Sequence, residues 1–100
     1  MCLQYSGQDM TDEVTRNEAR KRYELHAEGG IAVAYYELRG DAVAFVHTVV
    51  PDHLQGHGLA GILIKAALAD VRKRGLKVIA ECPFVARYIE RHPEERDLLA

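Results

Sequence analysis

The sequence predicts a small α/β domain of the α+β type, in which an antiparallel meander of strands leads into a strand-helix-strand-helix segment. Short apolar runs separated by glycine turns fill the first half of the chain, and helical spacing alternates with a further apolar run in the second half. The length of 100 residues suits one domain. Because two of the expected strands lack a polar face, we expect a mixed sheet with helices on both faces.

Three strands joined by tight turns are expected in the meander. From Arg20 to Ala27 apolar and polar residues alternate, as they do in a half-buried strand. After the turn at Gly29 and Gly30, the run Ile31–Leu38 is apolar on both faces, which is typical of a central strand. The third strand, Ala42–Val50, is also largely apolar, and the proline that follows ends it because proline has no N–H for the ladder.

A long helix, a strand and a short helix are expected to follow. Helical spacing of apolar residues begins at Leu59, and Gly75 stops the helix after a run of cations that suits its C-terminal dipole. The run Leu76–Cys82 predicts a strand. Phe84–His92 predicts a helix, because one proline suits its first turn and another proline ends it.

Composition and charge exclude several classes of protein. The formal net charge of -2 argues against a general nucleic-acid binder, and the basic run from Arg16 to Arg22 is expected to be a solvated edge strand, with nucleic-acid binding as the lesser alternative. No apolar run approaches the ~18–20 residues that span a bilayer, so no membrane association is expected. The five histidines show no metal-ligand spacing, so no metal is expected.

The ends and the cysteines indicate the setting of the domain. Cys2 and Cys82 suggest reduced thiols in a cytoplasmic protein rather than a disulfide. Met1–Asp12 is polar without periodicity, and we expect a disordered tail before a single domain that covers residues 13–100.

The segment QGHGLA, Gln55–Ala60, places two glycines where a strand passes into the long helix. The first turn of a helix has backbone N–H groups without intrahelical partners, and the helix dipole adds positive charge there. Gly56 and Gly58 allow the backbone unusual angles and a close approach to a phosphate. The spacing alone fits either a diphosphate cradle or a flexible turn. It does not fit a P-loop or a dinucleotide fingerprint.

Three stretches together carry a resemblance to a known family: HTVVPDHLQGHGLAGILIKAAL, LKVIAECPF and YIERHPE. The glycine segment resembles the pyrophosphate loop of the GCN5-related N-acetyltransferases (GNAT). The order of this loop, Cys82-Pro83-Phe84 and His92-Pro93-Glu94 is similar to the small, single-domain branch of that superfamily. The resemblance covers about Glu13 to Glu95 and favours the cradle over the flexible turn.

The resemblance implies a twisted sheet whose fourth and fifth strands splay apart to admit acetyl-CoA as co-substrate. The fourth strand would be Ala42–Val50 and the fifth Leu76–Cys82, with the acetyl group near the splay. Larger members carry two more helices between the first and second strands, where only Gly29 and Gly30 are expected here, so the acceptor site is expected to be open. The residues that the resemblance implies for CoA binding, through backbone pairing and the loop, are Val49, Val50, Gln55, Gly56, His57, Gly58, Leu59, Ala60 and Phe84.

Two residues near the splay are candidates for catalysis. His47 is the candidate base, because an imidazole accepts a proton at neutral pH, and alternation places it on the face of Val43 and Phe45. A core histidine bonded to a neighbouring element is the alternative. Cys82 is a candidate for a thioester intermediate or for lining the pocket, and the alternative is a small apolar filler. Glu81 is a further candidate base.

The last helix departs from the family pattern. Many relatives use a tyrosine there to protonate the leaving thiolate, and alignment puts Ile89 at that position with Tyr88 one residue away, or about 100° around the helix. Tyr35 and Tyr36 are expected to pack within their strand. His57 is expected to face solvent or the phosphates.

The resemblance thus implies an acetyl-CoA-dependent N-acetyltransferase that transfers the acetyl group directly to an amine in a ternary complex. The acceptor is unidentified: a protein side chain, a polyamine or another small molecule. The oligomeric state is expected to be a monomer or a weak homodimer. The alternative function is a non-catalytic acyl-CoA-binding or protein-interaction domain.

Overall fold

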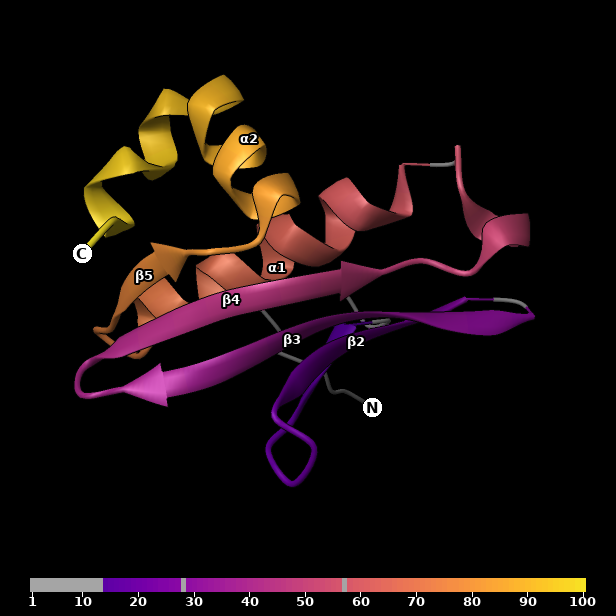
Figure 1. Cartoon of the computed structure of the whole chain (residues 1–100), viewed down its shortest axis with the longest axis horizontal. Helices are drawn as coiled ribbons and strands as arrows, with labels where there is room; N and C mark the ends of the chain where they lie inside the picture. The colour runs from indigo at the N-terminus through magenta and orange to yellow at the C-terminus, as the bar shows by residue number, and fades with distance from the viewer. Residues whose placement is uncertain (1–13, 28, 57) are drawn as a thin grey trace, which may run out of the picture.

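The computed structural model describes residues 14–27, 29–56 and 58–100, which form a five-stranded sheet with two α-helices beside it (Figure 1). The expected mixed sheet, with its antiparallel meander and strand-helix-strand-helix end, is confirmed. The expected tail, Met1–Asp12, lies outside the described residues. The elements are β1 (Val14–Asn17), β2 (Arg22–Ala27), β3 (Gly30–Arg39), β4 (Ala42–Val49), η2 (Asp52–Leu54), α1 (Leu59–Lys73), β5 (Lys77–Ala80), α2 (Pro83–Arg91) and η3 (Pro93–Leu98).

The sheet has the order β1-β2-β3-β4-β5, and each strand lies beside its neighbour in sequence. The first four strands pair antiparallel through short turns. β5 pairs parallel to β4, from Ala42 opposite Lys77 to Phe45 opposite Ala80. A parallel neighbour needs a crossover connection, and α1 supplies it.

The N-terminal hairpin differs from the sequence expectation. The structure pairs β1 with β2 and turns the chain at residues 18–21, so the run from Arg16 to Arg22 spans a hairpin turn rather than forming one edge strand. β1 has four residues, of which only Val14 is buried, so too little alternation exists to reveal it. The first two strands are therefore joined by this hairpin turn, whereas Gly29 lies in the turn from β2 to β3, and Gly30 begins β3.

One hydrophobic core lies between the sheet and both α-helices. Tyr23 and Phe45 from the strands, Leu63 and Leu68 from α1, and Ile89 from α2 are all at most 2% exposed within it. The two helices share one side of the sheet instead of covering both faces, which differs from the expectation. In this article the opposite side is called the helix-free face.

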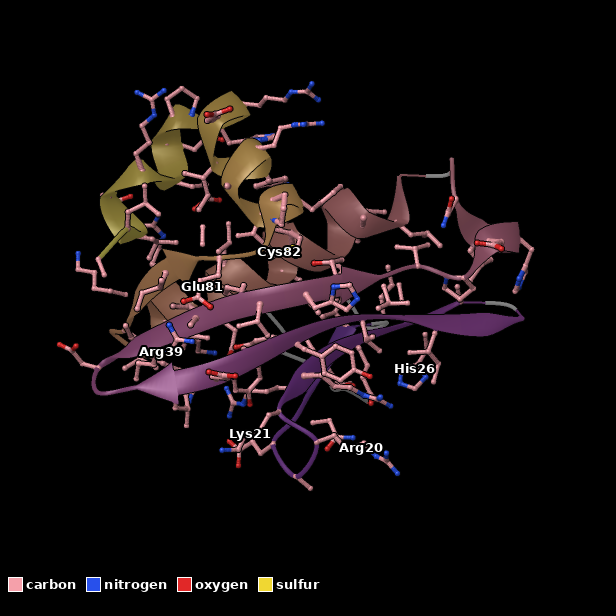
Figure 2. The ribbon with its side chains drawn as sticks, viewed as in Figure 1. Arg20, Lys21, His26, Arg39, Glu81 and Cys82 are labelled. Atoms are coloured by element: carbon pink, nitrogen blue, oxygen red, sulfur yellow. The ribbon has the colours of Figure 1, made fainter. Side chains whose placement is uncertain are left out.

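Charged side chains occupy the helix-free face in place of a helix layer. Arg39 donates hydrogen bonds to Glu37 and to Glu81, and the labelled Arg39 and Glu81 point toward each other in Figure 2. Arg22 Nε donates to Glu24 Oε2 at 2.6 Å. These ion pairs hold the pKa values of Glu24 and Glu81 below their ordinary values. Long charged side chains therefore cover the apolar residues of this face, which explains how strands with apolar residues on both faces can lack a second helix layer.

A β-bulge in β4 reverses the side-chain phase of this strand. Phe45 and His47 pair with consecutive residues of β3, so Val46 is one extra residue in β4. Unbroken alternation would place His47 on the core face with Phe45. The extra residue instead leaves His47 exposed on the helix-free face and turns Thr48 toward the helices. The expected placement of His47 with Phe45 is therefore wrong, because the bulge cannot be recognised from the hydrophobic pattern of the strand.

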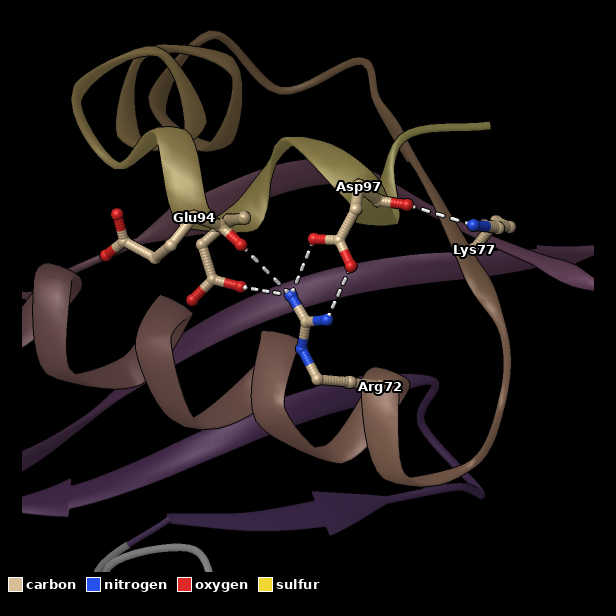
Figure 3. Close-up of polar contacts among 5 residues, drawn as sticks. Arg72, Lys77, Glu94 and Asp97 are labelled. Carbon is tan, nitrogen blue, oxygen red and sulfur yellow. Dashed lines mark hydrogen bonds and ion pairs between the residues drawn. The ribbon is translucent and has the colours of Figure 1, made fainter.

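The C-terminal segment η3 is held against α1 and β5 by charged contacts (Figure 3). Arg72 of α1 donates to the two carboxylate oxygens of Asp97 at 2.7 and 3.0 Å. Lys77 at the start of β5 donates to the backbone oxygen of Asp97 at 2.9 Å. These contacts keep Leu98, which is 4% exposed, in the core.

Candidate functional site

The loop that enters α1 is built on glycines in the left-handed region. Gly56 has φ 86°, and Gly58, the N-cap of α1, has φ 75°. No side chain of the described loop residues caps α1. The N–H groups of the first helical turn therefore remain available to an anion. A Cβ built on either glycine would find nothing within 4 Å, so the space in front of the loop is open.

A cavity of about 390 Å³ opens at this loop, between the end of β4 and the start of α1. Val49, which is 40% exposed, does not line it, and His57 lies outside the described residues. The other residues expected to bind CoA do line the cavity: Val50, Gln55, Gly56, Gly58, Leu59, Ala60 and Phe84.

The strands β4 and β5 separate beside this cavity. Their last pair is Phe45 with Ala80, and the Phe45 carbonyl then accepts the Cys82 N–H at 2.8 Å. β4 continues to Val49, while the chain after β5 turns away into α2. The part of β4 beyond the bulge therefore has β3 on one side and no β5 partner on the other.

Cys82 lies at the point of separation, at the N-cap of α2 (Figure 2). It is 4% exposed, and its Sγ lies 3.3 Å from Thr48 Oγ1, a hydrogen-bonding distance for sulfur. Thr48 also lines the cavity at the glycine loop. Because of the bulge, the Thr48 side chain both contacts the Cys82 thiol and lines the cavity. Thr48 was not among the residues predicted from the sequence.

A second cavity, of about 670 Å³, follows the first along the groove between α1 and α2. The two cavities share Gly58, Gly61 and Phe84, so they form one continuous depression. The groove is lined from α1 by Ile62 and Lys65 in addition to the shared glycines. From α2 and its end it is lined by Pro83, Phe84, Arg87, Tyr88, Arg91 and His92.

Sequence comparison decides the family. Residues 22–98 match the pattern of the GCN5-related N-acetyl-transferase family. The chain belongs to this family. The resemblance to the GNAT family is thereby confirmed, and this family supports acetyl transfer as the general activity of the chain.

Related proteins agree with this assignment. Protein NATD1 of Gallus gallus is 32% identical over 84 residues, which cover 81% of this chain and 76% of that protein. Protein NATD1 of Homo sapiens is 32% identical over 83 residues, which cover 80% and 74%. A solution structure of a GCN5-like protein from Staphylococcus aureus has the same fold, with a TM-score of 0.68, 24% identity and 91% of both chains covered.

The other polar candidates of this GNAT domain lie on its helix-free face. His47 is exposed there and pairs across the strands with Tyr35, whose ring centre lies 5.7 Å from the Arg22 guanidinium carbon. Glu81 is held by Arg39. Tyr36, 4% exposed, packs in the core as expected, since its ring centre lies 5.4 Å from that of Tyr23.

The last helix of the GNAT domain keeps the departure from the family pattern. Ile89, at the position aligned with the family tyrosine, is 2% exposed and belongs to the core. Tyr88 is half-buried, lines the α1–α2 groove and stacks on His92 with ring centres 3.9 Å apart. Burial raises the pKa of Tyr88 above its ordinary value, so its hydroxyl stays protonated at neutral pH.

The described ranges hold no group of three or more His, Cys, Asp or Glu side chains placed to bind a metal ion. Neither α-helix in these ranges combines the length and the apolar content needed to cross a bilayer.

Proposed function

We propose that this domain binds acetyl-CoA in the cavity at the glycine loop and transfers its acetyl group directly to an amine. The observation that carries the proposal is the uncapped start of α1, framed by Gly56 and Gly58 and facing a cavity that leads to the separation of β4 and β5. The cavity fits a diphosphate because free backbone donors and open space coincide there.

We assign two further sets of groups in the chain to the proposed cofactor. Backbone groups of Val49 and Val50, on the side of β4 that β5 leaves free, are placed to pair with an amide-containing arm as a strand would. Thr48 and Phe84 line the same cavity from β4 and α2. The cofactor supplies an activated acetyl thioester, and the protein positions it.

The two faces of β4 divide the chemistry. An amine that attacks the thioester carbon forms a C–N bond, breaks the C–S bond and must lose a proton. In the proposed reaction, His47, which is exposed on the helix-free face, takes that proton from an acceptor on the same face. On the cavity side, Cys82 and Thr48 form a hydroxyl–thiol pair beside the separation, where they line the thioester or donate to its sulfur.

Two measurements test the proposal. Acetyl-CoA should raise the thermal midpoint, because a ligand that binds only the native state stabilises it. Free CoA thiol should then appear when amines are supplied. His47→Ala should slow this release roughly a hundredfold if His47 is the general base. The control is His26→Ala, which removes another exposed histidine without touching the separation of the strands.

The cysteine is tested separately from the histidine. Cys82→Ser keeps a hydrogen-bonding group beside Thr48, whereas Cys82→Ala removes it. A thioester intermediate requires that both variants lose acetyl transfer and that the wild type carries a hydroxylamine-sensitive acetyl group. Retained activity in both variants assigns Cys82 to the pocket wall. If His47→Ala and Cys82→Ala both release CoA at the wild-type rate, the catalytic assignment is wrong.

A non-catalytic acyl-CoA-binding domain is the second candidate function. The observation in its favour is that Ile89 occupies the aligned tyrosine position and lies in the core, so the usual proton donor to the thiolate is missing from α2. Stabilisation by acetyl-CoA without CoA release from any amine would support this function over acetyl transfer.

A further inference from the structure

The groove between α1 and α2 carries a cluster of cations that the proposed chemistry does not use. Lys65 follows Gly58 and Gly61 along one side of α1 at helical spacing. Arg87 and Arg91 lie four residues apart on α2, and both line the same groove. The two helices therefore direct three positive side chains to one depression of about 670 Å³.

These cations differ from the paired arginines of the domain. Arg22, Arg39 and Arg72 each pair with carboxylates of the chain. Within the described ranges, Lys65, Arg87 and Arg91 form no hydrogen bond or ion pair with any residue, and no Asp or Glu lines the groove. The formal net charge of the whole chain is -2, so this positive site stands against the average charge. Its chemistry fits a phosphate.

The groove continues directly from the cavity at the glycine loop, with Gly58, Gly61 and Phe84 as common walls. A diphosphate held at the loop sends one arm toward the separation of β4 and β5. The adjoining groove gives the other arm a path along α1 and α2. In coenzyme A that second arm is an adenosine whose ribose bears a 3′-phosphate. Tyr88 and His92, stacked with 14° between their planes, give the groove a flat wall suited to a purine.

We propose that Lys65, Arg87 and Arg91 bind the 3′-phosphate of coenzyme A and make the domain select CoA over dephospho-CoA, which lacks only that group. The inference rests on the proposed CoA binding at the glycine loop. The loop backbone would bind the diphosphate that both nucleotides contain, and the three side chains of the α1–α2 groove would distinguish between them.

Titration calorimetry of the wild type with CoA and with dephospho-CoA tests the inference. Dephospho-CoA should bind roughly tenfold more weakly, and the difference should shrink as salt rises because it is electrostatic. The double variant Arg87→Gln/Arg91→Gln should bind CoA as weakly as the wild type binds dephospho-CoA, with dephospho-CoA binding unchanged. Both side chains are exposed and unpaired, so the variant should keep its fold, which circular dichroism checks.

A matched control separates a local effect from one of net charge. Arg20→Gln/Lys21→Gln also removes two charges, at the β1–β2 turn, away from the helices in Figure 2, and should preserve the CoA to dephospho-CoA ratio. Equal wild-type affinities for both nucleotides, or a ratio that persists in the double variant, would overturn the inference and leave the proposed function standing. Failure of both nucleotides to bind would instead refute CoA binding itself.

Discussion

Substitution of Gly58 by alanine should weaken both the fold and the cofactor site, by separable mechanisms. Gly58 has φ 75°, and alanine in the left-handed region costs about 1–2 kcal/mol of unfolding free energy. For a domain of this size, each kcal/mol lowers the thermal midpoint by about 4–8 °C. The new Cβ would meet no protein atom within 4 Å, so it projects into the space where the phosphates are proposed to lie.

The effect of Gly58→Ala on binding follows from that open space. A Cβ in front of the helix start should displace a phosphate oxygen from at least one backbone donor. Loss of one charge-assisted hydrogen bond, at about 1.5 kcal/mol or more, weakens CoA binding roughly tenfold. Calorimetric titration with CoA and urea unfolding of the same variant measure the two effects.

Gly40→Ala is the matched control for this prediction. Gly40 has φ 66° in the β3–β4 turn, and its added Cβ would also meet nothing within 4 Å, but it lines neither cavity. Gly40→Ala should show a similar loss of stability and unchanged CoA affinity. Full CoA affinity in Gly58→Ala, or an equal loss of affinity in both variants, would refute the proposed role of the loop. Unchanged stability in both would refute the strain argument.

Two further predictions concern the fold. Asp70 is 9% exposed and accepts hydrogen bonds from Tyr23 Oη at 2.6 Å and from Arg16 at 2.5 Å, which link α1 to the first hairpin. Asp70→Asn should therefore lower the free energy of unfolding, measured in urea, by about 2 kcal/mol. A loss under about 0.5 kcal/mol would show that this link contributes little to stability. The hydrogen bond from Arg22 holds the pKa of Glu24 below its ordinary 4.5, so its stabilisation exists above that pH and is lost as pH falls toward the lower folded-state value. Wild-type stability should therefore drop more steeply below about pH 4.5 than that of Glu24→Gln, and parallel pH curves would show that the pair contributes nothing.

The glycine loop could be predicted from the sequence because its signals are local. Gly56 and Gly58 stand directly before the first residue of a helical repeat, and α1 begins at Leu59, where the spacing begins. A glycine N-cap needs no information from the rest of the fold. The residues around this N-cap line a cavity, whose size depends on the packing of β4, α1 and α2 and therefore could not be predicted from the sequence.

The position of His47 could not be predicted, because the bulge that decides it depends on another strand. The residues around His47 are apolar on both faces of the strand, so the sequence gives no sign of a bulge, and only the pairing with β3 reveals Val46 as an extra residue. The cations of the groove were missed for a related reason. In the sequence, Lys65 and Arg87 look like ordinary exposed positions, because only the packing of α1 against α2 brings them to the same groove.

In the proposed reaction, the bulge would also direct the two substrates of this short chain to opposite faces of the sheet. His47 and Thr48 are neighbours in sequence, and strand geometry sends their side chains to opposite faces of the sheet. With the bulge, Thr48 faces the cavity and Cys82, while His47 faces the side without helices. Both large cavities lie on the helix side, so a small amine would find few contacts on the helix-free face. Under the proposed function, an acceptor with its own surface, such as a protein segment, would contact that face over a larger area than a free small amine.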